Sequence, residues 1–209
     1  NNMTGSFNES IRITSNLLNV KSKVVPSTSE CVYLYATMDD YVVVKGEANI
    51  PSFNHHISKV YYDHEVKAYP LGIEEILNAD LIIYGIGSLY TSILPNTIIP
   101  GINEALNQSK AKKVYFANCM TQSNETYDYD LKDHIDALNK HNTHVDMVIK
   151  HSNKIPEDIL ARYKAHNSIE VIDNHDSNVE VREYDLLNFD NNLVRHDSNK
   201  IKEVVEKLI

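Results

Sequence analysis

The sequence predicts an α/β protein: a Rossmann-like three-layer αβα fold with a mostly parallel sheet and a small antiparallel β insertion. Two observations predict this class. From Pro70 onward, short apolar runs alternate with helical patterns, as in a parallel sheet covered by helices on both faces. Across residues 26–69 the apolar period is two, which is typical of antiparallel strands. We therefore expect one domain over residues 1–209, with 26–69 as a β subregion inside it.

Composition narrows the class of protein further. The chain has 209 residues, of which 42% are apolar and 23% charged, so it can bury a sizeable core. A net charge of −9 offers no broad basic surface and argues against a nucleic-acid partner. Apolar runs such as 81–84 are far too short to span a membrane, and no signal peptide opens the chain. We expect a cytoplasmic protein without membrane insertion, with Cys31 and Cys119 as small buried thiols.

The first elements follow from apolar spacing. Ile13, Leu17 and Val20 share one face of a helix that is already under way near the start of the chain, so we expect a fragment. In the β subregion we expect strands at 31–37, 41–46 and 57–63, with Asp39-Asp40 as the first turn.

The remaining elements alternate in type. We expect strands at 81–84, 114–118, 145–149, 169–172 and 179–184, the first of them buried. We expect helices at 73–78, 97–107, 131–140, 156–165 and 198–209. Pro156 suits a first helical turn, and Ser198 is expected to cap the last helix.

The first candidate site is the Gly85-Ile86-Gly87-Ser88 turn that follows strand 81–84. Ligands of open α/β sheets bind beyond the carboxyl ends of strands. The two glycines are expected to allow positive φ and close approach of a ligand. Backbone N–H groups near Ser88 and Leu89, with the hydroxyls of Ser88, Thr91 and Ser92, can cradle a phosphate. A purely structural turn is the alternative.

The second candidate site is the end of strand 114–118, on the same rim of a parallel sheet. Asn118, Thr121 and Gln122 are neutral hydrogen-bonding residues suited to a ribose, a base edge or a sugar. Turn chemistry and a helix cap are the alternative reading.

The sequence gives less support to a metal site or to a catalytic nucleophile. The histidines, His55 and His56 among them, show no known ligand spacing, so we expect no resident metal. The acidic residues of 128–136 suit a helix N-terminus, with Mg²⁺ binding as the alternative. No Ser-His-Asp or cysteine nucleophile arrangement can be read, and no catalytic residue is assigned.

Several longer motifs carry a resemblance to a known family. They are Ala79-Asp80-Leu81-Ile82, the segments 85–96, 99–102 and 109–115, Met120-Thr121-Gln122, Glu125-Thr126, Asp133-His134 and Val194-Arg195-His196-Asp197. With these, the sequence resembles the bacterial gluconeogenesis factors, relatives of the 2-phospho-L-lactate transferases in the CofD-like family. The resemblance spans nearly the whole chain.

The sequence departs from the family pattern in three places. Ile86 stands where the family's turn has proline, and Ser123-Asn124 replaces a Pro-Gly pair. The family's opening strand, its Gly-Gly-Gly-Thr-Gly loop and the acidic and Asp-x-Arg motifs that follow do not occur. We therefore expect the chain to lack the family's N-terminal Gly-rich half and any catalytic or metal residues on it.

The resemblance implies a non-catalytic nucleotide-binding protein whose ligand is a UDP-sugar such as UDP-N-acetylglucosamine, or NAD. It implies a role in cell-wall synthesis and cell shape during gluconeogenic growth. Arg195 is the candidate partner of a phosphate or uracil, and Tyr163 of a stacked base. The full set of candidate ligand-binding residues is Gly85, Gly87, Ser88, Leu89, Tyr90, Thr91, Ser92, Asn118, Met120, Thr121, Gln122, Tyr163 and Arg195.

Two other functions stay open. One is a Mg²⁺-dependent transferase of the phospholactate type that uses a guanosine diphosphate donor. The other is an interaction module without a small ligand. Whether the chain forms a homo-oligomer is also left open.

Overall fold

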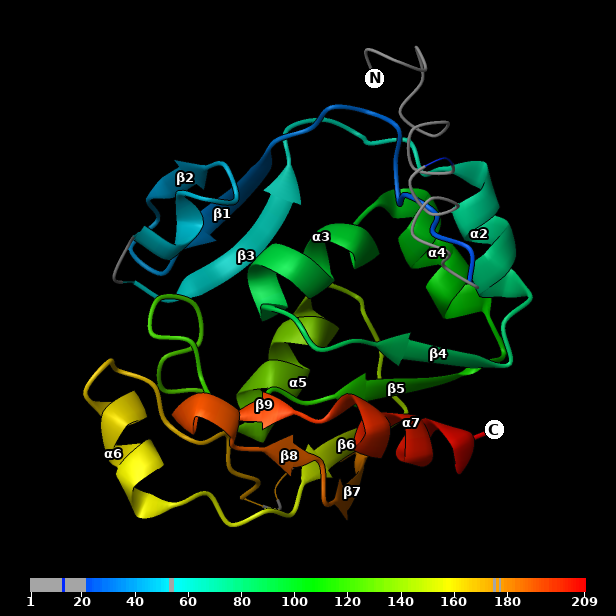
Figure 1. The fold of residues 1–209 in the computed structure, drawn as a ribbon. Helices are drawn as coiled ribbons and strands as arrows, with labels where there is room; N and C mark the ends of the chain where they lie inside the picture. The colour runs from blue at the N-terminus through cyan, green and yellow to red at the C-terminus, as the bar shows by residue number, and fades with distance from the viewer. Residues whose placement is uncertain (1–12, 14–21, 53–54, 175, 177) are drawn as a thin grey trace.

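The computed structural model describes residues 13, 22–52, 55–174, 176 and 178–209 (Figure 1). The expected opening helix lies outside the described residues, except for Ile13. The strands are β1 (Leu34–Met38), β2 (Val43–Lys45), β3 (Ile57–Tyr62), β4 (Leu81–Tyr84), β5 (Lys112–Phe116), β6 (Met147–His151), β7 (Glu180–Tyr184), β8 (Leu187–Asn188) and β9 (Arg195–His196). The α-helices are α2 (Pro70–Leu77), α3 (Leu94–Thr97), α4 (Pro100–Gln108), α5 (Leu131–Lys140), α6 (Glu157–Lys164) and α7 (Ser198–Glu206).

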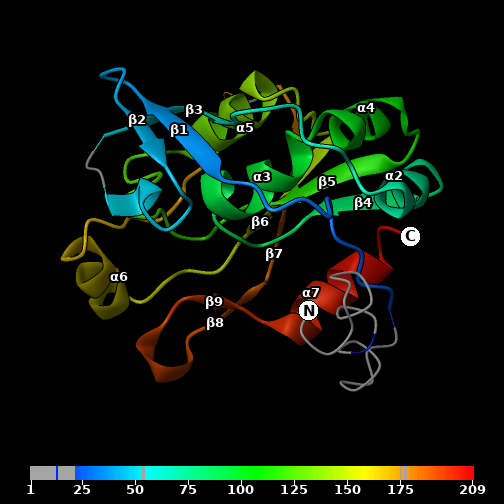
Figure 2. The same ribbon diagram turned by 90° about the horizontal axis from the view of Figure 1, so that it is seen from above.

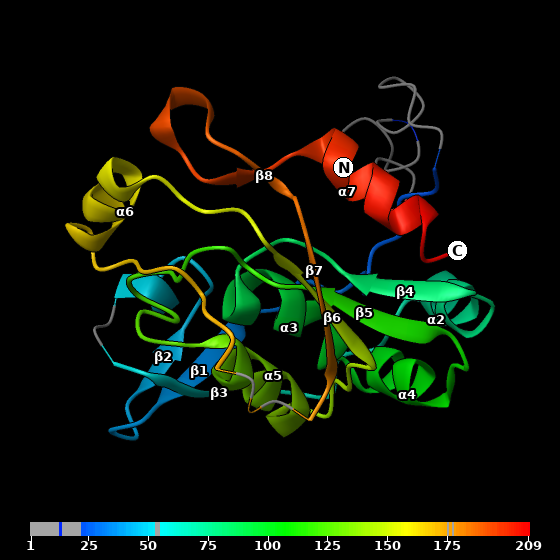
Figure 3. The same ribbon diagram turned by 90° about the horizontal axis from the view of Figure 1, so that it is seen from below.

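The centre of the fold is a parallel sheet in the order β4-β5-β6-β7. Helices α4 and α5 cover one face, and α6, α7 and the β8–β9 hairpin lie on the other (Figures 2 and 3). This is the predicted three-layer α/β class. All the carboxyl ends of the four strands therefore meet at one rim, where the site lies.

The two faces of the sheet belong to two apolar clusters, because successive strand side chains point to opposite sides. Tyr115 and Val148 face the cluster that includes α4 and α5. Val114, Met147 and Ile149 face the cluster that includes α6 and α7. All five side chains are essentially inaccessible, which is why β5 and β6 read as continuous apolar runs.

The β subregion is a three-stranded antiparallel sheet in the order β2-β1-β3. Leu34, Ala36 and Met38 are buried in the core, as the period of two predicts. The second strand is shorter than expected, because Tyr41 adopts a left-handed φ of 68° and β2 starts only at Val43. Cys31 precedes β1 and is exposed, so the prediction that it is buried is wrong.

Helix boundaries differ where proline or aspartate decides them. The expected helix 97–107 is two helices, because Ile99 is extended (φ −67°, ψ 122°) before Pro100, which begins α4. The last helix is capped by Asp197 rather than Ser198, and it ends at Glu206.

Two predicted strands also need correction. Strand β4 was expected to be buried, but it forms an edge of the described sheet and leaves Ile83 37% exposed. Segment 169–172 is not a strand, since it makes only an isolated bridge between Glu170 and Met120. The described helices include none with both the length and the apolar content needed to cross a bilayer.

Candidate functional site

Two neighbouring cavities open where β4 and β5 end. The first, of about 630 Å³, is called the acidic cavity; it is lined by Glu47, Ala48, Pro51, Ser88, Thr91, Gln122, Ser123, Asn124 and Glu125. The second, of about 460 Å³, is called the arginine cavity; it is lined by Ile86, Asn118, Cys119, Met120, Thr121, Gln122, Tyr163, Val194, Arg195 and His196. Because Gln122 lines both, the two cavities are adjacent. Both volumes lie in the range usual for small-molecule sites.

Of the two glycines in the turn after β4, Gly87 is needed for close packing, and neither has an unusual backbone angle. Of the described glycines, Gly46 alone has a left-handed φ, so the prediction of positive φ at Gly85 and Gly87 is wrong. A Cβ on Gly87 would lie 2.9 Å from the Cβ of Ser92, whereas one on Gly85 would meet nothing within 4 Å. Gly85, Gly87 and Ser92 line a smaller hollow of about 310 Å³ beside the turn.

The segment after this turn, Leu89–Ile93, is a π-helical turn whose N-terminal end is already in contact with the carboxyl group of Glu125. Glu125 is only 5% exposed; its Oε1 accepts a hydrogen bond from the Thr91 hydroxyl (2.7 Å) and its Oε2 from the Tyr90 N–H (3.3 Å). Burial, with a smaller contribution from Glu47, raises the pKa of Glu125. The group at the predicted phosphate position of Thr91 is therefore the protein's own carboxylate.

Polar residues that follow β5 brace the turn that follows β4. The Gln122 side chain donates from Nε2 to Ser88 Oγ at 2.7 Å. Asn118 donates from Nδ2 to the Gly87 carbonyl at 3.1 Å and accepts from the Tyr115 hydroxyl at 3.0 Å. The structure thus brings Ser88, Asn118 and Gln122 together, as expected for two loops on one rim.

Other predicted site residues serve the surrounding structure. The side chains of Leu89 and Tyr90 are buried in the core, and the Tyr90 hydroxyl hydrogen-bonds Tyr129 at 2.8 Å. The Thr121 hydroxyl donates to the Tyr127 carbonyl and accepts from the Ile169 N–H. Met120 borders the arginine cavity but is 7% exposed. The side chain of Met120 is thus mainly a packing residue.

The far wall of the arginine cavity comes from α6 and the β8–β9 hairpin. The Tyr163 hydroxyl accepts a hydrogen bond from the Val194 N–H at 3.0 Å, which ties α6 to the hairpin. Arg195 is exposed at the start of β9. These two residues therefore border the same cavity as Asn118, although they come from separate elements.

Two histidines, His196 in the lining of this cavity and its neighbour His151, were not predicted as site residues. Among the described residues, the buried side-chain nitrogens or oxygens without a hydrogen-bond partner all belong to His151 and His196. His151 ends β6 and is 2% exposed, with its Nε2 3.7 Å from Glu170 Oε1. Burial lowers the pKa of both rings, that of His196 to about 4, so both are neutral at pH 7. His196 belongs to the family-like motif Val194-Arg195-His196-Asp197, but no local pattern marks His151, and only the fold brings the two rings together.

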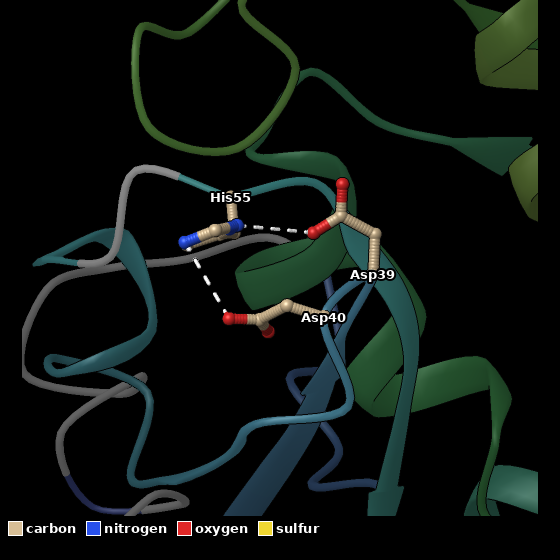
Figure 4. Close-up of side chains that lie close together, drawn as sticks. All are labelled: Asp39, Asp40 and His55. Atoms are coloured by element: carbon tan, nitrogen blue, oxygen red, sulfur yellow. Dashed lines mark hydrogen bonds and ion pairs between the residues drawn. The ribbon is translucent and has the colours of Figure 1, made fainter.

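The described residues place one group of three side chains of metal-ligand type together, and none of the three lines either cavity (Figure 4). His55 Nδ1 lies 3.2 Å from Asp39 and His55 Nε2 lies 3.5 Å from Asp40, so the ring bridges two carboxylates. All three side chains are exposed, and exposed ion pairs of this kind contribute little to stability. The spacing of His55 in the sequence gave no indication of this group.

The acidic run before α5 has a structural use. Asp130 and Asp133 form a reciprocal capping box, in which each carboxylate accepts the backbone N–H of the other at 2.9–3.0 Å. These two carboxylates are occupied by helix capping, which weakens the magnesium interpretation of the run.

Comparison with known proteins shows the family to which the chain belongs. Residues 1–189 match the family described as 2-phospho-L-lactate transferase CofD. The chain is 37% identical to a protein named gluconeogenesis factor from Bacillus subtilis, covering 100% of this chain and 68% of that protein. It is 36% identical to the gluconeogenesis factor of Halalkalibacterium halodurans, covering 97% of this chain and 65% of the relative. The chain thus spans about two thirds of the length of these relatives.

A solved structure extends the match to three dimensions. The crystal structure of a Bacillus halodurans protein superimposes with a TM-score of 0.93 at 35% identity, over 98% of this chain and 68% of that one. A second crystal structure of a protein from this organism gives a TM-score of 0.92. Sequence and structure therefore agree that the chain belongs to the CofD family, alongside the bacterial gluconeogenesis factors.

Proposed function

We propose that this protein binds a nucleotide ligand, a UDP-sugar such as UDP-N-acetylglucosamine or else NAD, at the carboxyl rim of its parallel sheet. The observation that carries the proposal is the pair of adjacent cavities that share Gln122. Ligands of open α/β sheets occupy this rim. An elongated ligand with chemically different ends fits two joined cavities of different charge.

The lining of the arginine cavity supports a nucleotide. Arg195 offers planar, bidentate donors for a phosphate or a uracil. Tyr163 presents an aromatic ring on the same cavity, and Asn118 and Gln122 supply amide donors and acceptors.

The names of the similar proteins support a role in carbon metabolism. The relatives at 36–37% identity carry the name gluconeogenesis factor. We propose that the protein, in the cytoplasm, links carbon metabolism to cell-wall synthesis and cell shape during gluconeogenic growth by sensing its nucleotide ligand.

The second candidate is a Mg²⁺-dependent transferase of the phospholactate type with a guanosine diphosphate donor. The matching family is described by that activity. The acidic cavity adds two carboxylates, Glu47 and Glu125, of the kind that hold Mg²⁺ beside a phosphate.

Calorimetric titration with UDP-N-acetylglucosamine, NAD and GDP, each with and without Mg²⁺, separates these candidates. We expect metal-independent binding of UDP-N-acetylglucosamine or NAD, weakened about tenfold or more by Arg195→Ala through loss of charged hydrogen bonds. Arg182→Ala, an exposed arginine on β7, is the matched control and should leave the affinity unchanged. Metal-dependent preference for GDP supports the transferase, and absence of binding by all three ligands contradicts both functions.

A further inference from the structure

We infer that the acidic cavity receives the uncharged, hydroxyl-rich end of the ligand and that Glu125 selects for it, while the phosphates lie in the arginine cavity. The inference rests on the proposed function and adds the direction in which the ligand lies. It reverses the assignment in which the Gly-Ser turn holds the phosphate.

The first argument for this orientation of the ligand is the charge of the two cavities. The described residues that line the acidic cavity include two carboxylates, Glu47 and Glu125, and neither lysine nor arginine. A phosphate there would face like charge at short range, with a buried partner screened little by water. The other cavity contains Arg195, so a diphosphate finds its opposite charge there.

The second argument for this orientation is the hydrogen bonding of Glu125. Its two oxygens accept one hydrogen bond each, from the Thr91 hydroxyl and the Tyr90 N–H. An ionised carboxylate has about four lone-pair positions, so Glu125 retains acceptor capacity on the cavity it lines. Sugar hydroxyls are donors that match this capacity, and phosphate oxygens are not.

The remaining lining of the acidic cavity fits a sugar as well. Ser88, Ser123 and Asn124 supply neutral hydroxyl and amide groups. Gln122 stands between the two cavities and donates to Ser88, so a ligand that occupies both cavities passes this side chain. The geometry thus orders the ligand as sugar, then the Gln122 position, then phosphates.

The test compares UDP-N-acetylglucosamine with UDP, which lacks the sugar, by calorimetry on the wild type and on Glu125→Gln. The amide is nearly the same shape but has lost the charge and half of the acceptor oxygens. We expect Glu125→Gln to weaken UDP-N-acetylglucosamine about tenfold, while the affinity for UDP stays equal or rises slightly because a negative charge is gone. If the phosphates occupied the acidic cavity, the variant would instead bind both ligands more tightly.

Controls separate the possible failures. Glu104→Gln, on the exposed side of α4, should change neither affinity, and Arg195→Ala should weaken both ligands equally. If Glu125→Gln does not fold, as judged by circular dichroism, Glu47→Gln replaces it, because Glu47 is exposed. We expect Glu47→Gln also to weaken UDP-N-acetylglucosamine but not UDP, by a smaller factor. Equal effects of Glu125→Gln on UDP and UDP-N-acetylglucosamine overturn this inference alone. Absence of binding by both UDP and UDP-N-acetylglucosamine in the wild type overturns this inference, and absence of NAD binding as well overturns the proposed function with it.

Discussion

Gly87 shows how one missing side chain shapes the turn after β4. Its position requires neither a left-handed φ nor a ligand, because the side chain of Ser92 already occupies the adjacent space. Gly85, two residues earlier in the same turn, has open space in place of a Cβ. The two glycines therefore have different physical roles, although both belong to the same Gly-x-Gly pattern in the sequence.

We expect Gly87→Ala to lower the free energy of unfolding by about 1–3 kcal/mol, the usual cost of forcing extra atoms into a packed site. Gly85→Ala is the matched control, and it should be neutral or slightly stabilising. Urea unfolding of both variants measures the difference. Equal stabilities would mean that the 88–92 segment shifts freely to accommodate the methyl group.

Glu125 gives a second prediction at this scale. Because burial raises its folded pKa above the unfolded value of 4.5, the native state holds a proton more tightly than the unfolded state does. The contribution of Glu125 to stability is therefore present at low pH and is lost as pH rises from about 4.5 through the folded pKa. We expect the free energy of unfolding of Glu125→Gln, relative to that of the wild type, to be higher at pH 7 than at pH 4. A constant difference between the two proteins would contradict the raised pKa.

At the scale of single elements, local signals decided which predictions succeeded. Helix α5 was predicted with the bounds it has, because its amphipathic pattern runs from the Asp130 cap to Lys140. The prediction of one helix over 97–107 is wrong because the apolar period continues across Ile99, where the backbone is extended before Pro100. Segment 169–172 is apolar, but it pairs only at Glu170, so its composition alone did not make it a strand.

The cap of α7 offers a direct test of such local assignments. The Asp197 carboxylate accepts hydrogen bonds from the N–H groups of Asn199 (2.8 Å) and Lys200 (3.2 Å), whereas the sequence favoured Ser198 as the cap. We expect Asp197→Ala to lower the free energy of unfolding by about 1 kcal/mol. Ser198→Ala, one residue away, should change it by less than about 0.5 kcal/mol. A larger loss of unfolding free energy in Ser198→Ala than in Asp197→Ala would instead support Ser198 as the cap.

For the molecule as a whole, alternation of strands and helices was enough to predict the layers and the rim where ligands bind. The partners within the site were not predictable in this way. Thr91 and Glu125 are 34 positions apart, and their hydrogen bond exists only because β4 and β5 are neighbours. His151 and His196 likewise meet only through the packing of the β8–β9 hairpin over the end of β6, which no periodicity expresses.

The buried histidines predict how the whole protein responds to acid. Burial, helped by neighbouring His151, lowers the pKa of His196 from 6.5 to about 4, so the native state resists protonation that the unfolded state accepts. Stability is therefore lost as pH falls from about 6.5 to about 4, by about 3 kcal/mol for His196 alone. His134, His141 and His151 act in the same direction.

Urea unfolding across pH 7 to 4 measures this loss. His196→Gln should flatten the acid limb of the stability curve, and His144→Gln, an exposed histidine, should leave it unchanged. An identical acid limb in His196→Gln and the wild type would contradict the lowered pKa.

The acidic cavity has a consequence for motion. One of its walls carries Glu47, Ala48 and Pro51 from the loop after β2, and the opposite wall comes from loops of the parallel sheet. A ligand that fills it links these two sheets, so any local opening that separates them must first release the ligand. Backbone amides in β1–β3 and in 88–93 should then exchange with deuterium more slowly, and to a similar degree, when ligand is bound. Ligand binding would then slow the local opening of β1–β3 without changing the conformation of these strands.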